Sequence, residues 1–352
     1  MQGSRWKRRR SLTACCTKMP ARALRRFARG VRRALAPSRK TGRCPVRQPM
    51  NPLDNPSAAY LHALASHAGI DAAGVAPPGD CRIEIEGRAF HYLDWGPADA
   101  PAIVLLHGGG QSAHTWDACC LLLARRYRCL ALDQRGHGDS DWSEEGAYSF
   151  DDHARDVDGF IQALRLHAPM LVGMSMGGIN ATAYATAHAA TLRGLVSVDV
   201  GPDVRFEAVE RLMRGLGAYR FFADPQDAAT RLSALGARRP RALLEATLGQ
   251  NLRQDAEQRW TWKYDPRTLS ERTAAEILDP RQALWARLAA ITCPALVIRG
   301  AESEIFAPAD AERFTRALPR GRFMTVPSAR HSVQTDNPKG LVAAIEAFDA
   351  SL

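Results

Sequence analysis

The sequence predicts an α/β fold, in which a mostly parallel β-sheet is covered by helices on both faces. Three observations lead to this prediction. Short apolar runs rich in β-branched residues alternate with helical stretches, each run ends in Gly, Asp or a polar loop, and a long helical segment interrupts the alternation. In open sheets of this kind, the functional site gathers at the carboxyl ends of the strands.

Eight segments are expected as strands, in the order in which the chain forms them. They are residues 81–86, 88–94, 102–106, 127–132, 170–173, 195–200, 295–298 and 322–326. Between the fourth and the fifth, Ser149 is expected to cap a helix, because Asp151 and Asp152 follow it as acids of a first turn. A second helix, residues 179–188, follows the fifth strand.

The segment 203–279 breaks the alternation of strands and helices. It reads as several helices rich in Arg and Leu, without a convincing strand, and we expect it to form a helical cap over the strand ends. The α/β core then comprises residues 81–202 and 280–352. Residues 51–80 are expected to be a helical lead-in to that core.

The net charge of +10 is unevenly distributed along the 352 residues. Residues 1–50 hold sixteen Lys and Arg and no Asp or Glu, which leaves 31 bases against 37 acids, a net charge of −6, for the remainder. The basic character therefore belongs to the N-terminal segment. The body of the chain carries no electrostatic sign of a nucleic-acid partner.

The basic segment 1–50 has three interpretations. Apolar residues recur at helical spacing among arginines, at Leu24, Phe27, Val31 and Leu35. A basic amphipathic helix of this kind is typical of an organelle-targeting sequence or of a segment that binds a membrane surface. Alternatively, the segment is a disordered extension, or a spurious one upstream of a start near Met50, because an acid-free composition of this kind forms no core. A secretory signal needs an apolar region after the charges, and none follows, so we expect a cytoplasmic protein.

The apolar runs and the cysteines argue against an integral membrane segment and against a metal site. No uninterrupted apolar run approaches the roughly 20 residues that span a bilayer, so no integral membrane segment is expected. The eight cysteines show no repeated CxxC spacing and no paired histidine ligands, so we expect no metal site. A set of reduced intracellular thiols is the simplest interpretation.

The strongest motif is Gly-Met-Ser-Met-Gly-Gly at residues 173–178. It lies directly between a predicted strand and a predicted helix, which is the setting of a nucleophile elbow with Ser175 at its tip. Gly173 and Gly177 allow a sharp turn that leaves the hydroxyl exposed. A bare GxSxG also occurs by chance as a flexible serine loop, but the strand before it and the helix after it favour a nucleophile.

Four blocks together resemble the α/β-hydrolase superfamily, in particular its capped serine carboxylesterases and cofactor-free hydrolases. They are residues 107–109 (His-Gly-Gly), 133–140, 173–178 and 329–331 (Ala-Arg-His), in the order of the family. The resemblance covers about residues 80–350. It implies an α/β-hydrolase fold with a mostly parallel eight-stranded sheet and a helical lid inserted after strand 6. It implies neither a cofactor nor a metal.

The resemblance also implies roles for individual residues. Ser175 would be the nucleophile and His331 the general base, since triads on this fold run in the order Ser, acid, His, and His331 is the only histidine after His188. The backbone amides of Gly109 and Met176 would form the oxyanion hole. His107 and the block 133–140 would have structural roles.

The acid of the triad has two candidates. The family commonly places it at about the third residue beyond a glycine after the seventh strand, where this chain has Ser303, followed by Glu304. Some esterases of the superfamily place the acid at the end of the preceding strand and pair it with a serine on the later loop. Asp199 fits that arrangement, and we favour it over Glu304.

These residues predict a serine hydrolase that cleaves a carboxylic ester through an acyl-enzyme intermediate. The expected partner is a small-molecule ester, and Met174, Phe221, Trp262 and Tyr264 are expected to line its pocket. The alternatives are another reaction on the same triad, namely carbon–carbon hydrolysis, thioester hydrolysis or cofactor-free perhydrolysis, and a non-catalytic ligand-binding relative. The sequence leaves the oligomeric state open.

Overall fold

The computed structural model describes residues 56–234, 240–269 and 271–352. The basic segment 1–50, with its possible start at Met50, lies outside the described residues. The lead-in 51–80 is described from residue 56 and begins with helix α2 (Pro56–Ala68).

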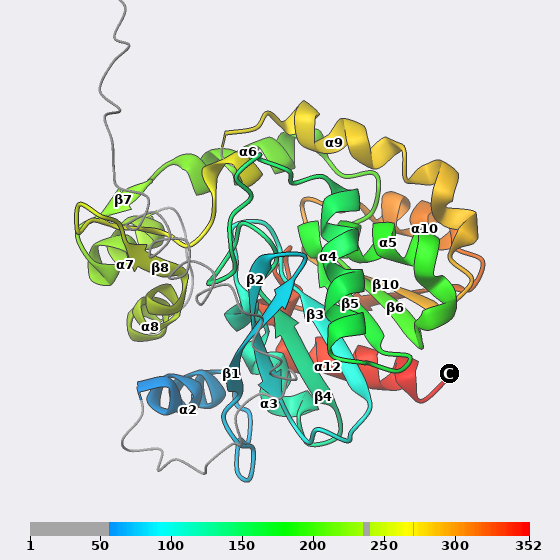
Figure 1. Ribbon diagram of the computed structural model, residues 1–352, viewed down its shortest axis with the longest axis horizontal. Helices are drawn as coiled ribbons and strands as arrows, with labels where there is room; N and C mark the ends of the chain where they lie inside the picture. Colours follow the sequence, from blue (N-terminus) through cyan, green and yellow to red (C-terminus); the bar gives the residue numbers. More distant parts are fainter. Residues whose placement is uncertain (1–55, 235–239, 270) are drawn as a thin grey trace, which may run out of the picture. The chain divides into compact units, whose positions relative to one another are not determined.

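The core of the protein is one eight-stranded sheet, as predicted (Figure 1). Its strands are β1 (Gly79–Ile85), β2 (Arg88–Trp95), β3 (Ala102–Leu106), β4 (Arg128–Leu132), β5 (Met170–Met174), β6 (Gly194–Val198), β10 (Ala295–Gly300) and β11 (Gly321–Val326). They lie in the order β1-β2-β4-β3-β5-β6-β10-β11. β2 pairs antiparallel with β1 and β4, and every other neighbouring pair is parallel, so the sheet is mostly parallel.

Successive side chains of a strand point to opposite faces of the sheet. Both faces are apolar because the central strands carry apolar residues at successive positions. In β3, Ile103 and Leu105 belong to one hydrophobic cluster, whereas Val104 and Leu106 belong to another. The first cluster includes residues of α2, α3 (Asp117–Leu123) and α12 (Pro338–Asp349). The second includes residues of α4 (Phe150–Ala163), α5 (Met176–His188) and α10 (Pro308–Ala317), and Figure 1 shows α4 and α5 in front of the sheet.

The predicted start of α4 is confirmed at its first turn. The Ser149 hydroxyl accepts a hydrogen bond from the Asp152 amide at 3.1 Å, and the Asp152 carboxylate accepts one from the Ser149 amide at 2.9 Å. This capping box satisfies two amides that the helix itself leaves unpaired.

The segment 203–279 contains strands as well as helices, which corrects the expectation of helices alone. The helices are α6 (Phe206–Gly217), α7 (Pro225–Ala234), α8 (Arg241–Asn251) and α9 (Ala274–Gln282). A small antiparallel sheet in the order β7-β9-β8 joins β7 (Phe221–Phe222), β8 (Leu252–Gln254) and β9 (Trp260–Trp262). Strands of two or three residues are too short for an alternating pattern to stand out.

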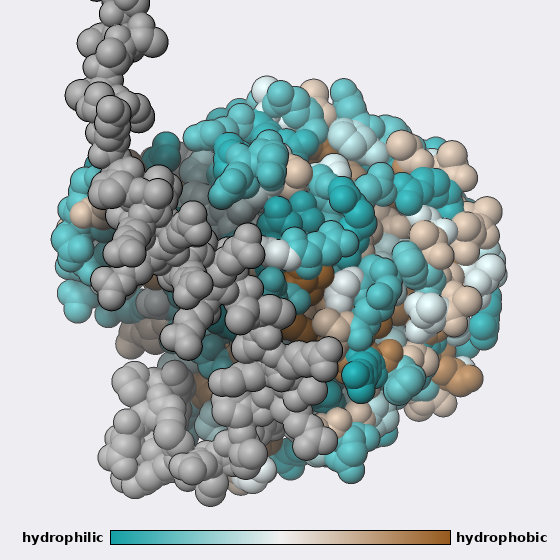
Figure 2. Space-filling view, in the orientation of Figure 1, coloured by the Kyte–Doolittle hydropathy of each residue, from teal (hydrophilic) through white to brown (hydrophobic). Residues whose placement is uncertain are grey.

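Helix α6 separates polar from apolar side chains. Ala208, Val209 and Met213 are buried and pack with Ala274 and Ile277 of α9. Figure 2 shows hydrophilic side chains over much of the area that α6 and α9 occupy in Figure 1. Burial of the apolar stripe therefore attaches α6 to α9 and leaves the charged face to solvent.

The cysteines of the described residues differ in their state. Cys119, Cys120, Cys129 and Cys293 are free and buried, as expected for reduced thiols. Cys81 is disulfide-bonded, so the expectation of a fully reduced set is wrong at that position.

Within the part of the chain that the structure describes, no helix has the length and hydropathy that a membrane span requires.

A buried carboxylate, Asp133, organises the loop after β4. It accepts hydrogen bonds from the His91 imidazole at 2.7 Å, the Ala113 amide at 2.6 Å and the Asp139 amide at 2.9 Å. Burial alone would raise the pKa of Asp133, but these donors and the charge of His91 lower it to about 2. The carboxylate thereby connects β2, β4 and the segment before α3.

Replacing this carboxylate should destabilise the fold. We expect Asp133→Asn to lower the free energy of unfolding at pH 7 by about 2–4 kcal/mol, because the amide nitrogen would face hydrogen-bond donors. The native pKa is lowered, so the wild-type contribution is complete above pH 4 and should decline by about 2 kcal/mol as the pH falls towards 2. Urea unfolding at pH 7, 4 and 2.5 measures both effects. The exposed control Asp99→Asn should follow wild type, and equal stability of Asp133→Asn and wild type at pH 7 would contradict the prediction.

Candidate active site

Ser175 occupies the sharp turn between β5 and α5. Its backbone has φ 52° and ψ −120°, a conformation that residues other than glycine rarely adopt. The Ser175 amide donates to the Val198 carbonyl at 3.1 Å, and the Ser175 carbonyl accepts from the Gly178 amide at 2.9 Å. These two bonds hold the strained turn between β6 and the first turn of α5, with Ser175 lining a cavity.

The glycines on either side of Ser175 allow backbone segments to touch. A Cβ atom on Gly173 would lie 2.1 Å from the Gly177 carbonyl oxygen, and one on Gly177 would lie 2.4 Å from the Leu106 carbonyl oxygen. Both distances are far below van der Waals contact, so only glycine fits at either position. Helix α5 therefore starts directly against β3 and β5.

The structure brings Ser175, His331 and Asp199 into one hydrogen-bonded chain. His331 Nε2 lies 3.0 Å from Ser175 Oγ, and His331 Nδ1 lies 2.8 Å from Asp199 Oδ2. His331 follows β11 in a loop that leads to α11 (Val333–Asp336). Three segments distant in sequence thus meet at the carboxyl edge of the sheet, as expected for a parallel arrangement.

Asp199 is fully buried and well supplied with hydrogen-bond donors. The Gly300 amide donates to Oδ1 at 2.8 Å, and the Ser303 hydroxyl donates to Oδ2 at 2.6 Å. Strand β6 ends at Val198, shorter than predicted, because Asp199 turns out of the strand with φ 54°. The partner serine on the later loop is the arrangement that the resemblance implied.

Glu304, the alternative acid, points away from His331. Its side chain is 77% exposed and forms an ion pair with Arg211 at 3.2 Å. Ser303 stands one residue earlier and contacts Asp199 instead. The geometry therefore favours Asp199 over Glu304 as the partner of His331.

Sequence reasoning missed Arg299, which shapes the loop beside Asp199. Its buried guanidinium donates to the carbonyls of Phe306 at 2.7 Å, Ala301 at 3.0 Å and Ser303 at 2.9 Å. Three carbonyls on one guanidinium hold the loop in the conformation that presents the Ser303 hydroxyl. No motif in the sequence identified this residue, because an arginine at a strand end is ordinarily exposed.

The two residues predicted to supply oxyanion amides, Gly109 and Met176, line the same cavity as Ser175. Met176 is the first residue of α5, where the helix leaves amides without an internal partner, and Gly109 lies in the loop after β3. His107 orders that loop, since its Nδ1 lies 2.8 Å from the Gly108 carbonyl and its Nε2 accepts from the Gln134 amide at 3.0 Å. Burial lowers the pKa of His107, which fits a neutral, structural histidine.

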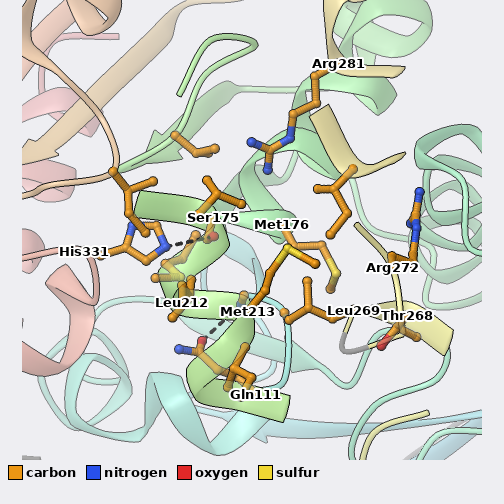
Figure 3. A pocket seen from close by; sticks show the side chains of 18 of the residues that line it. Gln111, Ser175, Met176, Leu212, Met213, Thr268, Leu269, Arg272, Arg281 and His331 are labelled. Atoms are coloured by element: carbon orange, nitrogen blue, oxygen red, sulfur yellow. Dashed lines mark hydrogen bonds between the residues drawn. The ribbon is translucent and has the colours of Figure 1, made fainter. Parts of the chain in front are cut away.

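A cavity of about 270 Å³ opens beside Ser175, and both predicted oxyanion residues line it (Figure 3). Met174, the first of the four expected pocket residues, also lines it. Seven further apolar lining residues come from α6, α9 and the loops around them: Val209, Leu212, Met213, Leu216, Leu269, Ile277 and Ile305. The cavity is therefore suited to a substrate with an apolar part.

Phe221, Trp262 and Tyr264 do not line this cavity, which corrects the other three pocket predictions. Trp262 and Tyr264 line a separate, smaller hollow, and Trp262 packs edge to face against Phe222 with ring centroids 5.3 Å apart. Phe221 is an exposed residue of β7 under the guanidinium of Arg259. Phe221 and Trp262 belong to strands of the small sheet, whereas Tyr264 follows β9 and forms an isolated bridge with His137.

Charged and titratable residues at the cavity were also missed. Arg272, Arg281 and His153 all line it. Burial lowers the pKa of His153 well below its usual value, with the positive charges around it adding to this effect. Burial lowers the pKa of Arg281 to about 10, so this guanidinium remains charged at neutral pH.

One group of side chains within the described part of the chain has the spacing of metal ligands. Ligand atoms of His91, Asp133 and Asp139 all lie within 4.8 Å of one another. Each already has a protein partner, since His91 bonds Asp133 and the Asp139 carboxylate forms an ion pair with Lys263 at 2.6 Å. We attribute the group to the hydrogen-bond network of the loop after β4.

Known proteins share this architecture. Residues 101–338 match the family model described as the alpha/beta hydrolase fold. Esterase Rv0045c of Mycobacterium tuberculosis is 31% identical over 268 residues, which are 74% of this chain and 86% of that protein. A crystal structure of that esterase has a TM-score of 0.65 with 28% identity and covers 86% of this chain and 98% of its own. The 2-(acetamidomethylene)succinate hydrolase of Mesorhizobium japonicum is 28% identical, over 70% of this chain and 87% of that protein. The chain belongs to the α/β-hydrolase family.

Proposed function

We propose that this protein is a serine hydrolase that cleaves a carboxylic ester through an acyl-enzyme intermediate. The observation that carries the proposal is the hydrogen-bonded chain from Ser175 through His331 to Asp199, at the edge of a largely apolar cavity. The relative from Mycobacterium tuberculosis is named an esterase, which supports an ester as the substrate. The partner is accordingly a small molecule.

In the first half-reaction, Ser175 Oγ attacks the carbonyl carbon of the ester while His331 Nε2 takes the hydroxyl proton. The carbonyl oxygen becomes an oxyanion, which the amides of Gly109 and Met176 stabilise. The carbon–oxygen bond of the ester then breaks. His331 returns the proton to the departing alcohol, and the acyl group stays on Ser175.

In the second half-reaction, His331 takes a proton from water, whose oxygen attacks the acyl carbon. The proton returns to Ser175 Oγ as the carboxylic acid leaves. Asp199 accepts the hydrogen bond of His331 Nδ1–H, orients the ring and stabilises the imidazolium of each step. Gly300 and Ser303 keep Asp199 in place through their hydrogen bonds.

We also propose that residues 203–279 act as the cap of the site. Leu212 and Met213 of α6, together with Leu269, line the cavity, so this segment contributes to the shape of the substrate pocket. The cytoplasmic location and the absence of a nucleic-acid partner stay predictions from the sequence.

Removal of the nucleophile tests the proposal. We expect Ser175→Ala to lose labelling by a fluorophosphonate probe and to reduce kcat on p-nitrophenyl butyrate by at least about 10⁴-fold. The exposed control Ser233→Ala should retain both properties. Labelling of wild type without turnover on a panel of oxygen esters would point to thioester, carbon–carbon or perhydrolase chemistry. Absence of both labelling and turnover in wild type would contradict an enzymatic function.

A second comparison tests the acid. We expect Asp199→Asn to reduce kcat/KM on p-nitrophenyl butyrate by about 10⁴-fold, because His331 would lose the acceptor that fixes its tautomer. Glu304→Gln should stay within about twofold of wild type, since an exposed ion pair contributes little. A collapse of activity in Glu304→Gln alone would overturn the assignment of Asp199.

A further inference from the structure

Arg281 is a buried cation with which no carboxylate of the described residues pairs. It is 94% buried near the end of α9, and its Nε has no hydrogen-bond partner within the described part of the chain. Burial is the one cause of its lowered pKa, with no carboxylate acting on it. Other buried arginines of this protein differ, since Arg135 pairs with Asp156 and Arg299 donates to three carbonyls.

The guanidinium of Arg281 faces the cavity beside Ser175. Arg281 and Ser175 both line that cavity, and Figure 3 shows the Arg281 side chain reaching towards Ser175 and Met176. A buried charge that lacks a protein counter-ion is costly, and the cost is offset if a bound ligand supplies the opposite charge.

The rest of the cavity carries no negative charge to compensate. Among the described residues that line it there is no Asp or Glu. A second arginine, Arg272, lines it as well, and its guanidinium donates to the Glu276 backbone carbonyl at 2.6 Å. His153, whose pKa burial lowers, adds no negative charge either. The cavity lining thus combines positive charge with apolar and neutral polar side chains and contains no carboxylate among the described residues.

We propose that Arg281 binds a carboxylate of the substrate, so that the natural ester carries a second, ionised carboxyl group joined to the reacting ester by an apolar chain. A carboxylate matches the planar fork of a guanidinium with two parallel hydrogen bonds, and its negative charge would balance the positive charge of Arg281. Leu212, Met213 and Ile277 would contact the apolar chain. This inference rests on the proposed ester hydrolysis and names its substrate class.

Binding to the Ser175→Ala protein tests the inference without any turnover. The probes are monomethyl adipate and methyl hexanoate, which differ by a carboxylate in place of a methyl group, and isothermal titration calorimetry gives both Kd values. We expect monomethyl adipate to bind about 10- to 100-fold more tightly, as for hydrogen bonds to charged groups. Methyl 6-aminohexanoate, which ends in a cation, should bind more weakly than methyl hexanoate. Equal affinities for the three esters would overturn the inference.

Variants assign the preference to Arg281. In the Ser175→Ala background, Arg281→Met should abolish the preference for monomethyl adipate, and Arg281→Lys should retain part of it. The matched control is Arg214→Met, because Arg214 is an exposed arginine of α6 outside the cavity. A preference that survives Arg281→Met would overturn the assignment.

The melting temperature excludes a purely structural role. Arg281→Met should melt at the wild-type temperature or above it, since the substitution removes an unpaired buried charge. Adipate should raise the melting temperature of the Ser175→Ala protein and not that of Ser175→Ala/Arg281→Met. A lower melting temperature in Arg281→Met would show that Arg281 stabilises the fold through the protein itself, against the inference.

Turnover by the wild type separates this inference from the proposed function. Hydrolysis of methyl hexanoate and monomethyl adipate with equal kcat/KM would leave the ester hydrolase in place and overturn the carboxylate site. Carboxylate-dependent binding without hydrolysis of any ester would support the site and contradict the proposed function. A comparison of monomethyl adipate with 5-acetoxypentanoate places the carboxylate on the acyl or on the alcohol side, according to which has the larger kcat/KM.

Discussion

Contact between backbones at the start of α5 is the constraint on which the site depends. Because Gly173 and Gly177 have no side chain, the first turn of α5 lies against the carboxyl ends of β3 and β5. This contact holds Ser175 in a conformation with positive φ and sets the Met176 amide across from the loop of Gly109. The strain at Ser175 is offset by the hydrogen bonds that the turn forms with Val198 of β6 and with Gly178 of α5.

The acid side of the site relies on the same sheet edge. β6, β10 and β11 are adjacent and parallel, so Asp199, Ser303 and His331, which follow these strands, lie within hydrogen-bond reach of one another. Arg299 connects the intervening loop carbonyls and thereby fixes the Ser303 hydroxyl. A carboxylate that is fully buried here remains an acceptor because protein donors replace the water it has lost.

Buried charges in this protein fall into two groups. Asp133 and Asp199 are surrounded by amide, hydroxyl and imidazole donors, so their burial contributes to the architecture of the loops around them. Arg281 has no such set of partners and lies at the cavity instead. The contrast distinguishes carboxylates that the described residues supply with donors from an arginine for which those residues supply no carboxylate, in keeping with the binding role that we propose.

Local sequence patterns were enough to predict the eight strands of the main sheet, the capped start of α4 and the sharp turn at Ser175, because each depends on residues close together in the chain. The sequence also led us to expect Ser175, Asp199 and His331 close together, because the ends of parallel strands meet at one edge, and the three side chains form one hydrogen-bonded chain. The contact of His331 with Asp199, and not with Glu304, came from the packing of the loops, since both carboxylates follow strands that end at that edge. The tertiary structure alone excluded Phe221, Trp262 and Tyr264 from the cavity and placed Arg281 there, because the direction and burial of a side chain depend on how distant segments pack.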